Sequence, residues 1–184
     1  MGTAIVWLRN TLRVHDNPLL DWAHRSEEIG SVIPVFVLDT DRGMGEEGQI
    51  GPNRMRFLYD SLTDLDERLR REYSARLLVL EGRPEEAVPL LAKELGSAGW
   101  LLCDYQADPK SRWQIGEIEA SVSEKGVRTK VFPSVSTILD IEESIAKPGF
   151  HDPKSSNDIG AIMSRNLGVG PDGYLVPPPL DAAE

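Results

Sequence analysis

Apolar and polar positions follow two alternating patterns along the first 132 residues. Short runs that are apolar throughout predict strands buried on both faces, and apolar positions spaced three and four apart predict helices with one buried face. The predicted strands are residues 4–8, 31–39, 76–82, 100–104 and 127–132. The predicted helices are residues 53–72, 84–95 and 109–124, and a further helix begins at Pro18.

The clearest helical pattern lies in residues 53–72, where Leu58, Leu62, Leu65 and Leu69 mark one face. Strands that alternate with helices indicate βαβ units, and such units build a parallel sheet covered on both faces. Right-handed crossovers leave few topologies for five strands. We therefore predict an α/β fold with a five-stranded, doubly wound parallel sheet, Rossmann-like, in the strand order 3-2-1-4-5.

The composition changes after Phe132. Residues 133–184 contain 7 of the 13 prolines and show little apolar periodicity. Such a segment is typical of an extended connector rather than of a second core. We predict that the chain has two parts: an α/β domain over residues 1–133 and an irregular connector over residues 134–184.

Charge and composition limit the classes of partner that the chain can bind. The chain has 184 residues, 40% of them hydrophobic, and a formal net charge of −10. This acidity argues against independent binding to a phosphate backbone, so we expect at most indirect contact with DNA. No apolar run is long enough to cross a bilayer, and the N-terminus has no signal-peptide pattern. We expect no membrane partner and a cytoplasmic location.

Little points to catalysis by this chain alone. Cys103 is the only cysteine and ends an apolar run, so we expect a buried, small apolar side chain. Three scattered histidines and one cysteine do not make a metal-ligand set. We predict no catalytic residue and no metal site.

Candidate binding residues follow the strands, because ligands of open α/β sheets bind beyond the carboxyl ends of the strands. These positions lie in residues 9–17, 38–56, 81–84 and 104–112. Two interpretations remain open for Arg9 and Arg13: they pair with acids at neighbouring strand ends, or they contact a partner.

Several of these residues also have a local role. Asp16 or Asn17 can cap the helix that begins at Pro18, and Asn53 and Asp108 are candidate caps of later helices. Arg54 lies in a first helical turn, where the helix dipole disfavours a cation, which hints at a ligand or a buried acid.

Five motifs occur in an order known from one family. They are W-L-R-N-T-L-R-V-H-D-N-P-L-L (7–20), P-V-F-V-L-D (34–39), N-R-M-R-F-L-Y-D-S-L-T-D-L-D-E-R-L (53–69), L-L-V-L-E-G-R-P (77–84) and D-Y-Q-A-D-P-K-S-R (104–112). Together they resemble the cryptochrome/photolyase family from about residue 3 to residue 150. The form N-R-M-R-F-L favours the cryptochrome and (6-4) photolyase branch.

The resemblance implies a division of labour between two domains. The family's N-terminal α/β domain can hold an antenna chromophore of the 8-hydroxy-deazaflavin or flavin type. The catalytic FAD belongs to a helical C-terminal domain, so FAD would be supplied only by a missing C-terminal domain or a partner chain. The antenna residues implied by the resemblance are Phe36, Val37, Leu38, Arg54, Gln106 and Asp108.

We therefore expect the antenna-binding α/β half of a DNA photolyase or cryptochrome. It would harvest light for blue-light DNA repair or photoreception together with a separate FAD-binding helical domain, and it would not be active alone. The alternative is a stand-alone nucleotide- or chromophore-binding module, or a truncated domain without repair activity.

Overall fold

A computed structural model of the chain describes residues 1–42, 50–106 and 108–132. The strands are β1 (Gly2–Trp7), β2 (Ile29–Asp39), β3 (Leu78–Gly82), β4 (Ala98–Asp104) and β5 (Arg128–Phe132). The helices are α1 (Pro18–Arg25), α2 (Pro52–Tyr73), α3 (Pro84–Leu95) and α4 (Pro109–Ser123), and a 3₁₀ turn (Thr40–Arg42) follows β2. The predicted connector, residues 134–184, lies outside the described residues.

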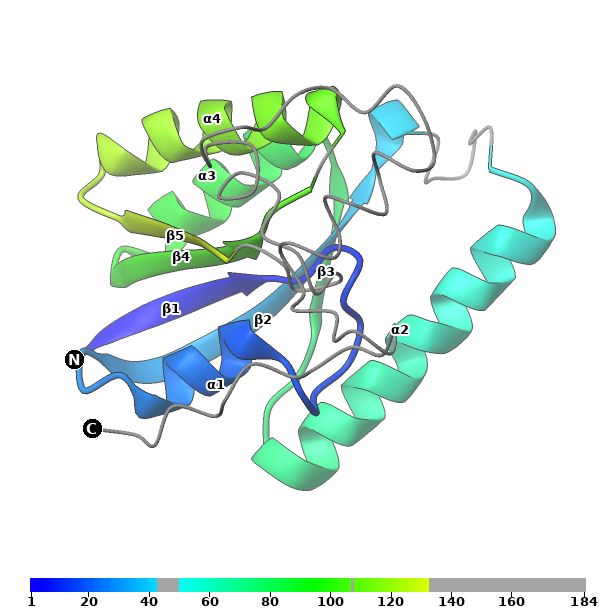
Figure 1. Ribbon diagram of the computed structural model, residues 1–184, viewed down its shortest axis with the longest axis horizontal. Helices are drawn as coiled ribbons and strands as arrows, with labels where there is room; N and C mark the ends of the chain where they lie inside the picture. Colours follow the sequence, from blue (N-terminus) through cyan, green and yellow to red (C-terminus); the bar gives the residue numbers. More distant parts are fainter. Residues whose placement is uncertain (43–49, 107, 133–184) are drawn as a thin grey trace, which may run out of the picture. The chain divides into compact units, whose positions relative to one another are not determined.

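The five strands form one sheet in the order β3-β2-β1-β4-β5, and every neighbouring pair is parallel (Figure 1). This confirms the predicted doubly wound α/β architecture. The central strand β1 ends at Trp7, which lies opposite Val35 of β2 and Cys103 of β4. The carboxyl ends of these three strands therefore meet at one edge of the sheet.

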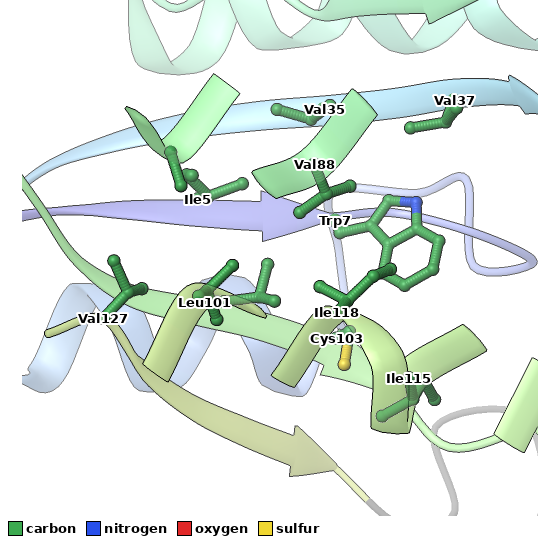
Figure 2. Close-up of a cluster of buried hydrophobic side chains, with 12 residues drawn as sticks. Ile5, Trp7, Val35, Val37, Val88, Leu101, Cys103, Ile115, Ile118 and Val127 are labelled. Carbon is green, nitrogen blue, oxygen red and sulfur yellow. The ribbon is translucent and has the colours of Figure 1, made fainter. Parts of the chain in front are cut away.

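Alternate residues of each strand serve two separate cores, as the period of a strand requires. Ala4, Val6 and Leu8 pack on the side covered by α1 and α2. Ile5 and Trp7 pack on the side covered by α3 and α4, where Figure 2 shows them among buried aliphatic side chains. Because both faces of the sheet are covered, its central strands are apolar throughout, which is the pattern seen in the sequence.

Helix α2 is buried only in its second half, through Leu62, Leu65 and Leu69. Its first turns are mostly exposed, and Phe57 retains 75% of its accessible surface. None of the described helices is long and apolar enough to cross a membrane.

Two of the predicted helix caps are confirmed and one is wrong. The side chain of Asn17 accepts from the backbone N–H of Leu19 at 3.1 Å, and Asp108 caps α4. Asn53 is not the cap of α2, because Gly51 holds that position. Pro52 follows it directly, and proline suits the first helical position since it needs no backbone hydrogen bond there.

Candidate functional site

A small cavity of about 50 Å³ opens where β1 and β2 end and α3 and α4 begin. This is the edge at which ligands of doubly wound sheets bind. The residues that line it are Trp7, Leu8, Arg9, Asn10, Phe36, Val37, Asp39, Pro84, Gln106, Ser111 and Gln114.

Arg9 connects the end of β1 to α4. Its guanidinium lies over the ring of the buried Trp7, 4.4 Å from the ring centroid, and its Nη2 donates to Ser111 Oγ at 2.7 Å. An arginine stacked on an indole is held by cation–π attraction as well as by hydrogen bonds. Arg13 plays a different part, because it donates to the backbone oxygen of Asp16 within its own loop. Arg13 thus pairs locally, and Arg9 bridges two elements.

Gln114 ties three elements together from the core face of α4. Its side chain is fully buried, and its Nε2 donates to Asp39 Oδ2 at 3.0 Å and to Glu85 Oε2 at 3.2 Å. The neutral amide therefore lets carboxylates from β2 and α3 share one donor group in a buried position. Gln114 is not among the residues predicted from the sequence, although a polar residue directly before Ile115 in an inward helical stripe was a signal for it.

A second polar chain joins the loop after β1 to β4. Asn10 Nδ2 donates to Gln106 Oε1, and Gln106 Nε2 donates to Asp104 Oδ2. Asp104 is 1% exposed, and its Oδ1 has no hydrogen-bond partner among the described residues. Burial raises the pKa of Asp104, and the nearby charge of Arg9 opposes that rise.

Ion pairs close the outer side of this edge. Arg83 lies 2.8 Å from a carboxylate oxygen of Glu85, 3.0 Å from one of Glu86 and 3.2 Å from one of Asp41. The attraction of Glu85, together with Asp41, raises the pKa of Arg83. Arg83 thus belongs to the framework that joins β3, α3 and the turn after β2.

Only three of the six binding residues expected from the sequence line the cavity. Phe36, Val37 and Gln106 line the cavity. Leu38 is buried with Phe36 in the cluster on the α2 side of β2, and it is not among the lining residues. Arg54 is exposed in the first turn of α2, and Asp108 caps α4 through Ser111, so neither is among the lining residues.

The cavity is small for a ring system. Pockets for ligands of drug size have volumes of about 300 to 1,000 Å³. A cavity of about 50 Å³ admits a substituent or a few water molecules. The described residues therefore offer apolar side chains, two chains of hydrogen-bonded polar groups and a small opening.

The sequence comparisons agree on one family. The sequence profile of the DNA photolyase family matches residues 4–155. A (6-4)DNA photolyase of Oryza sativa subsp. japonica is 36% identical over 172 residues, covering 88% of this chain and 31% of that protein. Cryptochrome-2 of Gallus gallus is 33% identical over 162 residues, covering 88% of this chain and 27% of that protein.

Solved structures show the same fold. The Synechocystis sp. PCC6803 cryptochrome superposes with a TM-score of 0.74 at 23% identity, covering 95% of this chain and 35% of that one. The photolyase of Sulfolobus tokodaii, described with two FAD molecules, gives a TM-score of 0.66 at 24% identity, covering 91% of this chain and 35% of that one. The chain thus spans about a third or less of the length of these proteins.

Proposed function

Because this chain belongs to the DNA photolyase family, we propose that it is the antenna-binding α/β half of a photolyase or cryptochrome. A separate helical domain binds FAD, and any contact with DNA is made through that domain. The chain covers only 31% of the rice (6-4) photolyase and 27% of the chicken cryptochrome, which leaves most of their length for the second part. The cytoplasm is the proposed location.

The observation that carries the proposal is an apolar strand end beside fixed amides. Phe36 and Val37, close to the carboxyl end of β2, line the cavity, and Gln106 lines it from the loop after β4. An aromatic wall with a few placed polar groups is what a planar chromophore needs. In the proposal, Leu38 supports this wall from behind, and Arg54 and Asp108 contact the polar parts of the chromophore.

Gln106 would orient the ring. Asn10 and Asp104 hold its amide in one orientation, since Oε1 accepts from the first and Nε2 donates to the second. A primary amide has two donors and two acceptor positions, so one of each remains for a ligand. When bound, an antenna chromophore absorbs light and transfers the excitation to the flavin of the second domain.

A chromophore titration tests the proposal. The full chain is mixed with 8-hydroxy-deazaflavin or FMN, and binding is followed by the quenching of chromophore fluorescence. We expect binding of one of them, weakened about tenfold in Gln106→Leu because a buried hydrogen-bonding group is lost. Glu117→Gln, on the exposed face of α4, is the matched control and leaves binding unchanged.

Two results would contradict this function. One is the absence of binding by either chromophore together with a colourless protein from the natural host. The other is a Kd that Gln106→Leu does not change. Co-elution of the chain with an FAD-binding helical domain tests the partner separately, and two independent monomers would count against the partner alone.

A further inference from the structure

Strand β3 forms one edge of the sheet. It pairs with β2 on one side, and its outer edge makes no backbone hydrogen bond to any other element among the described residues. Val79, the second residue of the strand, retains 42% of its accessible surface. An open strand edge is a template to which another extended segment can add.

An apolar groove lies beside this edge, between β3 and α3, with a volume of about 370 Å³. We call it the β3–α3 groove. Its apolar lining consists of Leu80 from β3 and of Ala87, Leu90 and Leu91 from α3. Leu90 is 57% exposed, which is unusual for a leucine in a covered core and leaves apolar surface for a partner.

The rim of the groove is acidic. It carries Glu81, Glu86 and Glu94, and Arg83 is its single cation. Arg83 already contacts three carboxylates, as described above. Glu81 and Glu94 are exposed and form no ion pair with any described residue. The rim therefore has negative charge to offer to a basic ligand.

We propose that the β3–α3 groove binds an extended segment of a partner protein that carries basic residues on both sides of an apolar one, and that this segment adds to β3 as a sixth strand. This is the β-augmentation mode of recognition, in which backbone hydrogen bonds and alternate side-chain pockets act together. The β3–α3 groove shares no lining residue with the cavity of the proposed antenna site.

The spacing of the rim charges specifies the segment. Glu86 and Glu94 are two turns apart on α3, about 12 Å along the helix axis. Two side chains on the same face of a strand and four positions apart are separated by about 13 Å. Lysine or arginine at positions 1 and 5 therefore reaches the two carboxylates, and an apolar residue at position 3 packs on Leu80 and Leu91.

Charge also decides between a partner and a second copy of this chain. Pairing of β3 with its own copy would bring Glu81 and Glu94 of both chains to one interface. Like charges at facing positions destabilise strand pairing, and charged edge residues protect natural sheets from self-association. A basic segment is instead attracted by the same glutamates.

Labelled peptides of matched length test the groove on the full chain by fluorescence anisotropy. We expect Lys-Val-Leu-Val-Lys to bind and Glu-Val-Leu-Val-Glu not to bind. The double variant Glu86→Lys/Glu94→Lys reverses the two carboxylates that the spacing assigns to the basic residues. It weakens the first peptide about fivefold or more and gains affinity for the second, because exposed ion pairs have modest energies. Glu67→Lys, exposed on α2, is the matched control and changes neither affinity.

Backbone methylation tests whether the peptide adds as a strand. Alternate N–H groups of a strand point to opposite edges, so methylating positions 2 and 4 or positions 3 and 5 blocks opposite sides. We expect one methylated peptide to lose binding and the other to keep it. Equal behaviour of the two would overturn strand addition. No binding of the lysine peptide up to about 1 mM, or affinity insensitive to the charge reversal, would overturn the groove itself.

Discussion

Gln114 is the most informative position to perturb, because one buried amide joins β2, α3 and α4. Gln114→Met keeps the length of the side chain and removes the donor that serves Asp39 and Glu85. Gln114→Glu keeps the shape and replaces that donor with a third carboxylate. Glu117→Met, on the exposed side of the same helix, is the matched control.

The structure sets the expected magnitudes. A hydrogen bond to a charged group contributes about 1.5 to 3 kcal/mol, so the loss of two lowers the free energy of unfolding by about 3 kcal/mol in Gln114→Met. Gln114→Glu places two carboxylates within contact of a third, and each such repulsion is about 4 kcal/mol at an effective dielectric constant of 20. Arg9 offsets part of this repulsion, which leaves a loss of about 5 kcal/mol.

Urea unfolding followed by circular dichroism measures these changes at neutral pH. We expect the order of stability to be wild type, then Gln114→Met, then Gln114→Glu, with the control within about 0.5 kcal/mol of wild type. The loss in Gln114→Glu should shrink at acidic pH, since a protonated carboxyl can again donate a hydrogen bond. Equal stability of the two variants, or a loss no larger than in Glu117→Met, would refute the bridging role of this amide.

Three further predictions use other parts of the molecule. Burial raises the pKa of Cys103 to about 12, so the folded thiol should resist iodoacetamide at pH 8 and react after unfolding in urea. The folded state favours the neutral thiol, so its contribution to the free energy of unfolding is fully present below about pH 9 and is lost as the pH rises toward 12. The difference in free energy of unfolding between wild type and Cys103→Ala should therefore narrow over that range. Burial also raises the pKa of Asp104, so ionisation of this carboxyl opposes folding, and Asp104→Asn should gain stability relative to wild type in thermal unfolding as the pH rises above the ordinary pKa of an aspartate. Asn17→Ala should lose about 1 to 2 kcal/mol in urea unfolding because the cap of α1 is removed, whereas Asn17→Asp, which keeps the oxygen that accepts from Leu19, should lose less.

Each of these three predictions has an outcome that would contradict it. They are a folded Cys103 thiol that reacts as fast as the unfolded one, an Asp104→Asn difference that does not change with pH, and equal losses for the two Asn17 variants.

The fold was predictable because its determinants are local and periodic. The apolar runs at residues 4–8 and 100–104 are long enough for buried strands only, and Leu62, Leu65 and Leu69 place one face of α2 on the sheet. Alternation of such segments permits few topologies once crossovers are right-handed. The strand ends differ from the predictions by up to two residues, because pairing such as Gly2 with Ile29 extends strands into residues without a strong apolar pattern.

The site was predictable only in outline. Ligands of open α/β sheets bind beyond the carboxyl ends of the strands. This rule, together with the family resemblance, selected Phe36, Val37 and Gln106, and these residues line the cavity. It did not separate them from Arg54 and Asp108, which are not among the lining residues, and it did not select Gln114. The sequence shows which residues follow a strand, but not which of them face the same opening.

The sequence by itself determined the elements, their parallel arrangement and the edge of the sheet at which the candidate site lies, because the spacing and burial preference of side chains are properties of short segments. Only the tertiary structure decided that Arg9 meets Ser111 across 102 residues and that Gln114 meets Asp39 across 75. A hydrogen bond needs its atoms within about 3 Å, whereas apolar patterning is satisfied by many side-chain arrangements. The partners of polar groups are therefore set by how helices pack on the sheet, and that packing is a property of the whole fold.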